Sequence, residues 1–357
     1  MKGRFDITYV AGHRMSEPVA YDERIIIVSK CRKLNTAKND IMFYTEIKSQ
    51  PVKGKKVLVT GGAGFIGSNL VRTLSKDNDV VVLDNLHTGR KENIEGAIAD
   101  GTEFIKGDAK DIKSLKGDFD QVFHLGIYSA SPMYRENPNL VGEVVHGMIN
   151  ILEYCKESKI PLVFASTSSI YNGIEPPHRE DVIPGVTDFY TEARIACERL
   201  GKLYANLYDV NVSAMRFFSV YGYNDIGKGK YANLVTQFMV SLINGEQPII
   251  YGEGEQRRDF VFVTDVVDAL LKASSSKGFN VYNVGTGKNY SLNEAMERLK
   301  KITGNKIEPK YIRMPVKNYV MTTLADPSKA KKEIGFEAKV NLDKGISLLY
   351  SSILPKE

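Results

Sequence analysis

The chain has 357 residues, 43% of them hydrophobic, which is enough for one large α/β unit with a smaller lobe or for two domains. Its 48 basic and 43 acidic residues give a net charge of +5 without long basic blocks, so no nucleic-acid partner is indicated, whereas an anionic small molecule is compatible. The 3 cysteines are widely spaced, which predicts neither disulfides nor a metal site, and no signal peptide or membrane span is apparent, so we expect a cytoplasmic protein.

Residues 1–53 are expected to form an appendage that stands apart from the rest of the chain, because they lack clear periodicity. Tyr21 to Ser29 is rich in isoleucine and valine and is compatible with an extra edge strand. Alternatively, residues 1–39 lie upstream of the true translation start, with Met42 as the initiator. Both interpretations stay open.

The segment Val57 to Ser68, VLVTGGAGFIGS, combines a buried strand, a tight glycine turn and a helix start. The β-branched run at its beginning is typical of a parallel strand buried on both faces. Gly61, Gly64 and Gly67 follow at three-residue spacing, so the backbone can approach a pyrophosphate closely while the helix N-terminus points its amides at it. The segment predicts a phosphate cradle.

The next predicted strand, Val80 to Leu83, ends in Asp84, about 20 residues beyond the turn, as in dinucleotide-binding units. A carboxylate there can accept hydrogen bonds from the adenosine ribose and repels a 2′-phosphate. We therefore expect NAD rather than NADP.

Further strands alternate with amphipathic stretches, which predicts βαβ organisation and a parallel sheet. These strands are Glu103 to Lys106, Gln121 to Leu125, Leu162 to Ser166 and Val212 to Phe217.

Eight ordered motifs between about Lys56 and Leu349 resemble the extended short-chain dehydrogenases/reductases, in the NAD-dependent epimerase/dehydratase family, and most of all the UDP-hexose 4-epimerases. The motifs are VTGGAGFIGS, LDNLHTG, KGDAKD, VFHLG, STSSIY, YTEAR, RFFSVYG and GEGEQRRDFVFVTD. The resemblance implies an α/β fold with a doubly wound parallel sheet (Rossmann) and a smaller C-terminal substrate-binding lobe. Residues 54–215 would form the NAD-binding domain and residues 216–357 mainly the nucleotide-sugar lobe, with some segments returning to the sheet.

The resemblance also implies which residues bind NAD. They are Gly61, Gly64, Phe65, Ile66, Gly67, Asp84, Asn85, Thr88, Asp108, Ala109, Leu125 and Gly126, together with Tyr190 and Arg194.

By the same resemblance, catalysis depends on Thr167, Tyr190 and Arg194. A tyrosine and a cation four positions later share one helix face, so the charge can stabilise a phenolate. The pKa of an ordinary phenol is about 10, so a nearby positive charge must lower it if the phenol is to act as a base near neutral pH. The resemblance predicts lysine where this chain has Arg194, and the two are not interchangeable at such a site. Either Arg194 is positioned slightly differently from the lysine and the enzyme is active, which we favour, or the enzyme is slow or has lost catalysis.

Ser168 and Ser169 occupy the places that carry an Asp-Glu pair in the related 4,6-dehydratases, and the glutamate of the related decarboxylases is also absent from this segment. Hydroxyls cannot do that carboxylate work at neutral pH. Reversible oxidation at C4 of a sugar is the simplest remaining chemistry: Tyr190 would take the 4-hydroxyl proton, the hydride would pass to NAD, and the 4-keto sugar would receive it back on its other face.

The resemblance also implies a nucleotide-sugar site, but here the sequence matches the family pattern at fewer positions than in the NAD site. Its residues would be Thr167, Ser219, Asn233, Leu234, Tyr251, Arg258 and Thr323. Arg258 matches the family's phosphate-binding arginine. A second phosphate-binding arginine is out of register, and Arg313 or Lys317 is its candidate substitute. Uridine is the expected base, with guanosine, thymidine and cytidine left open. The small Thr323 would leave room for an N-acetyl group on the sugar.

Two further expectations concern assembly and rival functions. The resemblance implies a homodimer built by the helix that starts near Asn139 and the helix that carries Tyr190, although Ile195, Leu200 and Leu203 are equally compatible with the core. The rival functions are a nucleotide-sugar reductase or dehydrogenase of the same fold, and a non-catalytic NAD-binding sensor or scaffold.

Overall fold

The computed structural model describes residues 52–354 except 116, 186, 315, 316 and 318. The predicted edge strand at Tyr21 to Ser29 and the alternative start at Met42 lie outside these residues. Within the described part, no helix is both long and apolar enough to cross a membrane.

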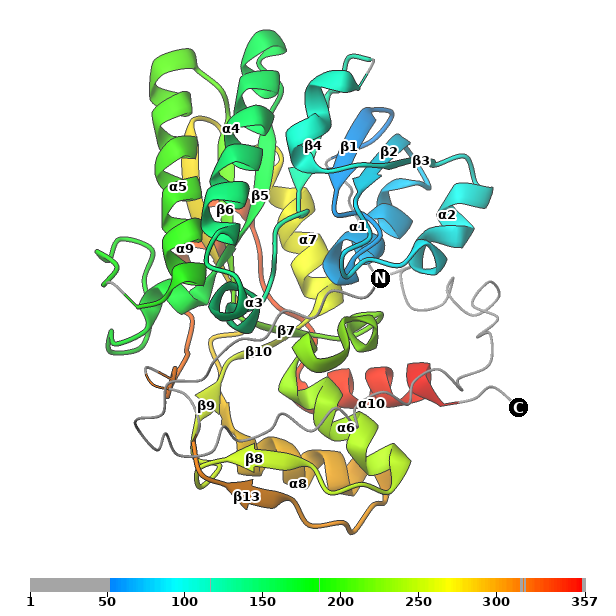
Figure 1. The fold of residues 1–357 in the computed structure, drawn as a ribbon, viewed down its shortest axis with the longest axis vertical. Coiled ribbons are helices and arrows are strands. Elements are labelled where there is room, and N and C mark those ends of the chain that lie inside the picture. Colours follow the sequence, from blue (N-terminus) through cyan, green and yellow to red (C-terminus); the bar gives the residue numbers. More distant parts are fainter. Residues whose placement is uncertain (1–51, 116, 186, 315–316, 318, 355–357) are drawn as a thin grey trace, which may run out of the picture. The chain divides into compact units, whose positions relative to one another are not determined.

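A seven-stranded parallel sheet, in the order β11-β6-β5-β4-β1-β2-β3, forms the centre of the described unit (Figure 1). Its strands are β1 (Lys56–Thr60), β2 (Asp79–Asp84), β3 (Glu103–Lys106), β4 (Gln121–His124), β5 (Leu162–Thr167), β6 (Val212–Phe217) and β11 (Phe279–Val284). Six of these strands were predicted from their apolar runs, within two residues of their observed bounds. β11 was not predicted.

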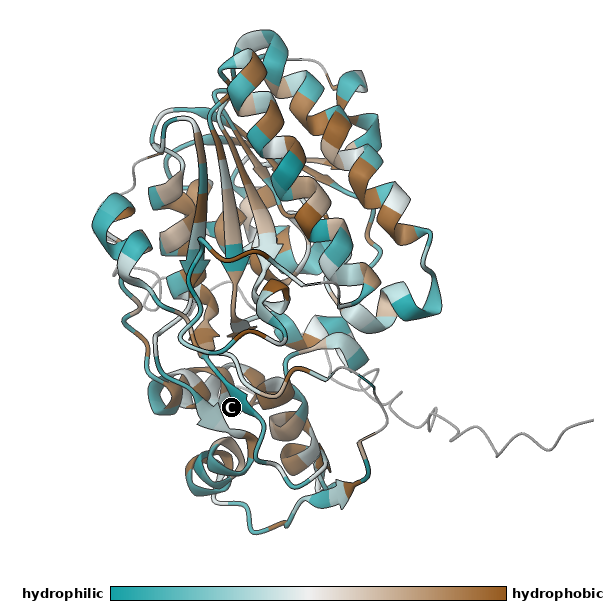
Figure 2. Cartoon of the chain, turned by 90° about the vertical axis from the view of Figure 1, so that its left-hand side faces the viewer, coloured by the Kyte–Doolittle hydropathy of each residue, from teal (hydrophilic) through white to brown (hydrophobic). Residues whose placement is uncertain are grey.

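Helices cover both faces of the sheet, because side chains along each strand point alternately to opposite sides. Val57 and Val59 of β1 join one apolar core, whereas Leu58 joins the other. The first core includes residues of α1 (Phe65–Leu74), α2 (Glu95–Ala99), α7 (Val263–Ala273) and α9 (Ser328–Ile334), and the second includes residues of α3 (Ser131–Glu136), α4 (Leu140–Ser158) and α5 (Phe189–Tyr208). In Figure 2 the strands are mostly apolar and the outward helix faces mostly polar. This arrangement confirms the predicted doubly wound fold.

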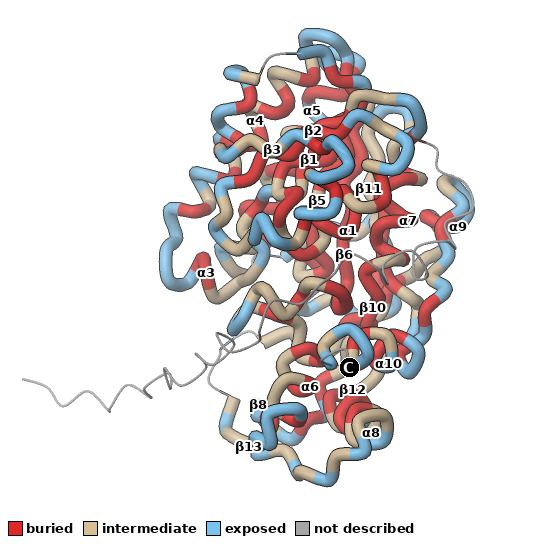
Figure 3. Tube along the Cα trace, turned by 90° about the vertical axis from the view of Figure 1, so that its right-hand side faces the viewer, coloured by how far each residue is buried: buried red, intermediate tan, exposed pale blue. Residues whose placement is uncertain are grey.

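A smaller lobe is built from segments in the second half of the chain, between which α7 and β11 return to the sheet. It has an apolar core of its own, and its helices are buried on their inner sides in Figure 3. Its helices are α6 (Leu234–Asn244), α8 (Leu292–Thr303) and α10 (Leu342–Ile353). Three two-stranded pairs accompany them: β7 (Ser219–Tyr221) with β10 (Phe260–Phe262), β8 (Ile249–Tyr251) with β13 (Lys310–Ile312), and β9 (Arg257–Arg258) with β12 (Tyr290–Ser291). Four short 3-10 helices complete the described elements: η1 (Lys91–Ile94), η2 (Ala109–Ser114), η3 (Ser168–Tyr171) and η4 (Asp225–Tyr231).

A buried charged network fixes α5 against the sheet. Glu198 of α5 accepts hydrogen bonds from Ser166 of β5 at 2.6 Å and from both Nε and Nη2 of Arg216 of β6, at 3.0 and 2.8 Å. Arg216 also donates to the hydroxyl of Tyr171 at 2.8 Å. Because an unpaired buried charge is costly, this network holds α5 at one register relative to β5 and β6.

Candidate active site

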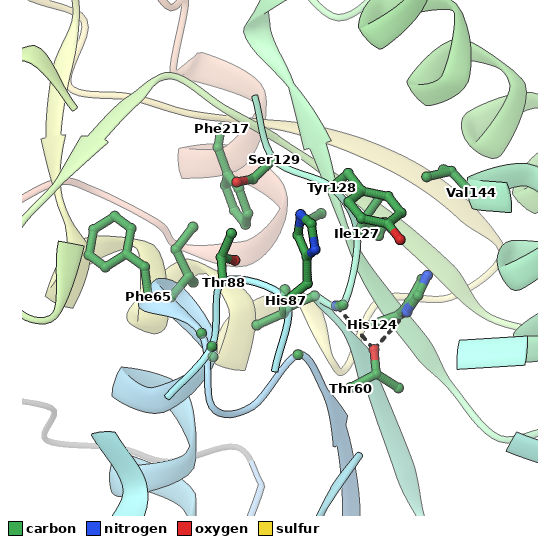
Figure 4. A pocket seen from close by; sticks show the side chains of 18 of the residues that line it. Thr60, Phe65, His87, Thr88, His124, Ile127, Tyr128, Ser129, Val144 and Phe217 are labelled. Atoms are coloured by element: carbon green, nitrogen blue, oxygen red, sulfur yellow. Dashed lines mark hydrogen bonds between the residues drawn. The ribbon is translucent and has the colours of Figure 1, made fainter. Parts of the chain in front are cut away.

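A pocket opens at the carboxyl ends of the sheet strands, where ligands of doubly wound folds bind. Its walls come from the segments that follow β1, β2, β3, β4 and β5, from the starts of α1 and α5, and from η4. In Figure 4 His87 and Thr88, from the loop after β2, lie between Phe65 and Tyr128.

The glycine turn is packed too closely for side chains. Gly61 has φ +70°, and a Cβ added to it would lie 2.5 Å from the backbone N of Gly126. A Cβ on Gly67 would lie 2.0 Å from the carbonyl oxygen of Gly61. The first turn of α1 carries no acidic residue, so the positive end of its dipole is uncompensated. These features fit the phosphates of a dinucleotide.

Asp84 lies at the end of β2, 6% exposed, and lines the pocket. Its carboxylate accepts hydrogen bonds from the backbone N of Ala63 at 2.9 Å and of Leu86 at 2.7 Å, so it ties the glycine turn to the loop after β2. Burial raises the pKa of Asp84, and these two hydrogen bonds oppose that rise. The remaining lone pairs of the carboxylate suit the diol of an adenosine ribose.

The other predicted NAD residues also line this pocket. They are Gly61, Gly64, Phe65, Ile66, Gly67, Asn85, Thr88, Asp108, Ala109, Leu125, Gly126, Tyr190 and Arg194. Asn85 and Asp108 are joined directly, since the Asn85 amide donates to the Asp108 carboxylate at 2.9 Å. The structure therefore brings the whole predicted set to one place and fits NAD, although the role of each residue remains a prediction.

His124, at the end of β4, was not singled out from the sequence. Its Nδ1 lies 2.7 Å from the hydroxyl oxygen of Thr60, which also accepts a hydrogen bond from the backbone N of Gly126 at 3.2 Å (Figure 4). Burial, with a smaller contribution from the charge of Arg194, lowers the pKa of His124 to about 3. An imidazole that is neutral near pH 7 therefore joins β1 to β4 in the wall of the pocket.

Tyr190 and Thr167 line the same pocket from different elements. Tyr190 is in the first turn of α5, where the side chain of the N-cap residue Asp188 accepts a hydrogen bond from the backbone N of Thr191 at 2.8 Å. Thr167 ends β5 and caps η3 by accepting from the backbone N of Ser169 at 3.1 Å. The ring of the buried Tyr134 meets that of Tyr190 edge to face, with centroids 5.4 Å apart.

Arg194 lies one turn after Tyr190 on α5, and the central carbon of its guanidinium is 5.1 Å from the centroid of the Tyr190 ring. Its Nη2 donates to the carbonyl of Tyr128 at 2.7 Å and its Nη1 to that of Ala165 at 3.5 Å. Its buried Nε has no hydrogen-bond partner among the described residues. Burial works against the charge, but the phenols of Tyr134 and Tyr190 outweigh it and raise the pKa of Arg194.

The predicted nucleotide-sugar residues divide into two groups. Thr167, Ser219 and Asn233 line the pocket, whereas Leu234, Tyr251, Arg258 and Thr323 are not among the residues that line it.

The guanidinium of Arg258 donates to the backbone carbonyls of Arg257, Val320 and Met321 and stacks on the ring of Tyr319. Burial lowers the pKa of Arg258. Thr323 is 4% exposed, and its hydroxyl accepts a hydrogen bond from the backbone N of Asp259 at 3.2 Å. The roles predicted for these residues remain predictions.

A doubly wound parallel sheet with a tight glycine turn, an acid at the end of β2 and a tyrosine beside a buried cation is typical of the dinucleotide-dependent short-chain dehydrogenases/reductases. Within that class, a family model described as the NAD dependent epimerase/dehydratase family matches residues 57–285. The chain belongs to this family and is an NAD-dependent epimerase.

Relatives named for several activities match most of this chain. The UDP-glucose 4-epimerase of Mycolicibacterium smegmatis is 33% identical over 304 residues, covering 82% of this chain and 96% of the relative. The UDP-glucuronic acid decarboxylase 2 of Arabidopsis thaliana is 31% identical, covering 83% of this chain and 68% of the relative. Among solved structures, the UDP-N-acetylglucosamine 4-epimerase of Methanobrevibacter ruminantium, in complex with UDP-N-acetylmuramic acid, matches with a TM-score of 0.79 and 29% identity over 85% of this chain and all of that chain.

Proposed function

We propose that this enzyme inverts C4 of a UDP-hexose, most simply UDP-glucose and UDP-galactose, through a transient 4-keto sugar. The observation that carries the proposal is the convergence of Thr167, Tyr190 and Arg194 on the pocket that also contains the glycine turn and Asp84. The UDP-glucose 4-epimerase among the relatives supports the same reaction.

The chain's own groups supply proton transfer and positioning. NAD, when bound, supplies the capacity to take up and return a hydride. Tyr190 is the proton acceptor for the sugar 4-hydroxyl, and the adjacent Arg194 cation stabilises its phenolate. Thr167, fixed at the end of β5, offers its hydroxyl to the same sugar oxygen. One base that takes a proton and gives it back is sufficient for epimerisation.

By the resemblance, the related dehydratases and decarboxylases carry a further carboxyl group in the segment after Thr167. Ser168 and Ser169 line the pocket next to Thr167, where such a group would be expected. The acidic residues among the described residues that line the pocket are Asp84, Asp108 and Glu143. The first two belong to the dinucleotide side, and Glu143 accepts a hydrogen bond from the Tyr128 hydroxyl at 3.3 Å. This distribution favours epimerisation over the decarboxylase activity named for one relative.

N-acetylhexosamine forms of the substrate are the second candidate. A solved relative is named as a UDP-N-acetylglucosamine 4-epimerase, which favours this extension. The small Thr323 would leave room for an N-acetyl group only if it bordered the sugar, and this side chain is not among those that line the pocket. We therefore place glucose and galactose first.

The test is a panel of nucleotide sugars with UDP-, GDP- and dTDP-hexoses, scored for C4 inversion by proton NMR. Epimerisation of UDP-glucose without net change in absorbance at 340 nm is expected, because the bound cofactor is regenerated in each turnover. Stoichiometric consumption of added NADH or NADPH would instead identify a reductase. Binding of NAD with no turnover of any sugar would identify a sensor.

A further inference from the structure

The ammonium group of Lys228 is a second cation in the pocket, and no role described above uses it. Lys228 lies in η4, its side chain is 16% exposed, and it lines the pocket together with Thr167 and Tyr190. Among the described residues that line the pocket, Arg194 is the one other lysine or arginine, and two of its nitrogens already donate to backbone carbonyls. Of these two cations, Lys228 is therefore the one whose N–H groups are not already directed at backbone carbonyls, so it can donate to an anion in the pocket.

A buried carboxylate fixes the position of Lys228. Asp225 is fully buried, and its Oδ1 lies 3.6 Å from Nζ of Lys228. Its Oδ2 accepts hydrogen bonds from the backbone N of Asn233 at 2.9 Å and from the hydroxyl of Thr236 at 2.7 Å. One carboxylate thus places both the lysine and the start of α6. Because 3.6 Å exceeds the length of an ordinary hydrogen bond, the ammonium keeps N–H donors for a ligand.

The start of α6 adds positive potential to the same region. Asn233 caps this helix, lines the pocket, and is followed by a first turn without acidic residues. The amide groups and dipole of a helix N-terminus favour anions. Arg258, the phosphate ligand predicted from the sequence, instead donates to three backbone carbonyls outside the pocket lining. The pocket therefore has its own cation for a diphosphate on the substrate side.

We propose that Lys228 binds the diphosphate of the nucleotide sugar, a role that rests on the function proposed above. A doubly charged diphosphate matches a compact ammonium beside a helix N-terminus. The pyrophosphate of NAD has a separate set of donors in the amides of the glycine turn at the start of α1. Asp225 contacts both Lys228 and the backbone N of Asn233, and both residues line the pocket, so one ligand can reach both.

The experiment compares Lys228→Met with Lys230→Met in the full chain, with calorimetric titration of UDP and measurement of NAD affinity. Lys230 is a matched control, because it lies two residues further along η4, beyond the kink at Gly229, its side chain is 56% exposed, and it pairs with Glu136 rather than lining the pocket. We expect Lys228→Met to weaken UDP binding by about 10- to 100-fold, the usual effect of removing one charged hydrogen bond. NAD affinity should be unchanged, KM for the sugar nucleotide should rise more than kcat falls, and Lys228→Arg should retain most of the UDP affinity.

Equal UDP affinities for Lys228→Met and Lys230→Met would overturn the assignment while leaving the proposed epimerase intact. Loss of NAD affinity with unchanged UDP affinity would also overturn it and place Lys228 on the cofactor. A wild-type protein that binds no UDP and turns over no UDP-sugar would contradict the proposed function itself, and the role of Lys228 with it. Melting temperatures of all variants separate these outcomes from misfolding.

Discussion

The guanidinium of Arg194 is held in place by two hydrogen bonds, but its Nε makes none among the described residues. Its terminal nitrogens donate to the backbone carbonyls of Tyr128 and Ala165. The central carbon of the guanidinium lies 5.1 Å from the centroid of the Tyr190 ring. The guanidinium therefore lies beside the Tyr190 ring and also supports the segment at Tyr128. Under the proposed function, this position would let arginine supply the charge where the resemblance predicts lysine.

Replacing Arg194 with methionine should reduce kcat by about 10²- to 10⁴-fold, because the phenol loses the charge that stabilises its ionised form. Arg194→Lys keeps the charge and should keep measurable activity. The exposed Arg199, on the same helix, provides a control, since Arg199→Met should behave as wild type. Full activity in Arg194→Met, measured by NMR of the sugar nucleotide, would show that Arg194 is not part of the catalytic group.

His124 makes a prediction about stability and pH. Its pKa in the folded protein is about 3, below the ordinary 6.5, so the folded protein binds fewer protons than the unfolded chain between these values. The neutral form of His124 is the one that the fold accommodates, so its contribution to the free energy of unfolding is fully present above pH 6.5. This contribution is lost as the pH falls towards the pKa of about 3 in the folded protein. Lowering pH from 7.5 to 5 should cost about 2 kcal/mol through this one residue.

The measurement is urea unfolding of the wild type and His124→Gln at both pH values. The variant should lose less stability than the wild type on acidification, because glutamine does not titrate. His178, whose pKa burial also lowers, is present in both proteins and cancels in the comparison. If the free energy of unfolding of the wild type and of His124→Gln changed equally with pH, the pKa of His124 would be the same in the folded and unfolded protein, which would contradict this prediction.

At the scale of elements, the glycine turn makes the sharpest prediction. A methyl group on Gly67 would meet the carbonyl oxygen of Gly61 at 2.0 Å, so Gly67→Ala must displace the turn or the start of α1. We expect a loss of about 1 to 3 kcal/mol in stability, as for other overpacked sites, and weakened retention of NAD. Melting temperature and the NAD content of purified protein measure these two effects.

Gly96 is the matched control for this change. It lies in α2, and a Cβ there would have no neighbour within 4 Å. Gly96→Ala should therefore be neutral or stabilising by up to about 1 kcal/mol, since alanine favours helix. If the two substitutions left the same stability and the same NAD content, the turn would not be the close-packed cradle described above.

Most of the central sheet was predictable, because the strands from β1 to β6 alternate with amphipathic helical stretches and most of them are apolar. β11 was missed for a physical reason: it contains Asn283, which is fully buried but satisfied by the Tyr171 hydroxyl and the carbonyl of His178. A polar residue with such distant partners is typical of a loop when the sequence is considered alone. The pairs of the smaller lobe are only two or three residues long and leave no periodic pattern.

The candidate site was predictable in part. The spacing of the glycine turn and Asp84 reflects the local geometry of a βαβ unit, whereas Tyr190 and Arg194 were singled out through the family resemblance; all of them line the pocket. The orientation of Arg258 was not predictable, since its acceptors Val320 and Met321 are 62 and 63 residues away along the chain. Lys228 gave no signal either, because its pairing with Asp225 looks like a surface contact until the burial of the carboxylate is known.

At the scale of the whole molecule, α5 presents exposed apolar side chains that suit a second copy of this chain. Leu203 and Leu207 are 48% and 61% exposed. We expect a homodimer through this surface, as the resemblance predicted, and expect Leu207→Glu to shift it towards the 39.8 kDa monomer in light scattering. Ile183→Glu is the control, because Ile183 is 89% exposed but lies outside α4 and α5. A wild-type monomer at micromolar concentration would contradict this expectation.

The central claim is that the phenol of Tyr190 exchanges the proton of a sugar hydroxyl at the mouth of a dinucleotide pocket. The most direct measurement is the rate of C4 inversion of UDP-glucose by Tyr190→Phe, followed by proton NMR in protein confirmed to be folded and to contain NAD. We predict a fall of about 10²- to 10⁴-fold relative to the wild type, with NAD retained. An unchanged rate in the phenylalanine variant would contradict the account.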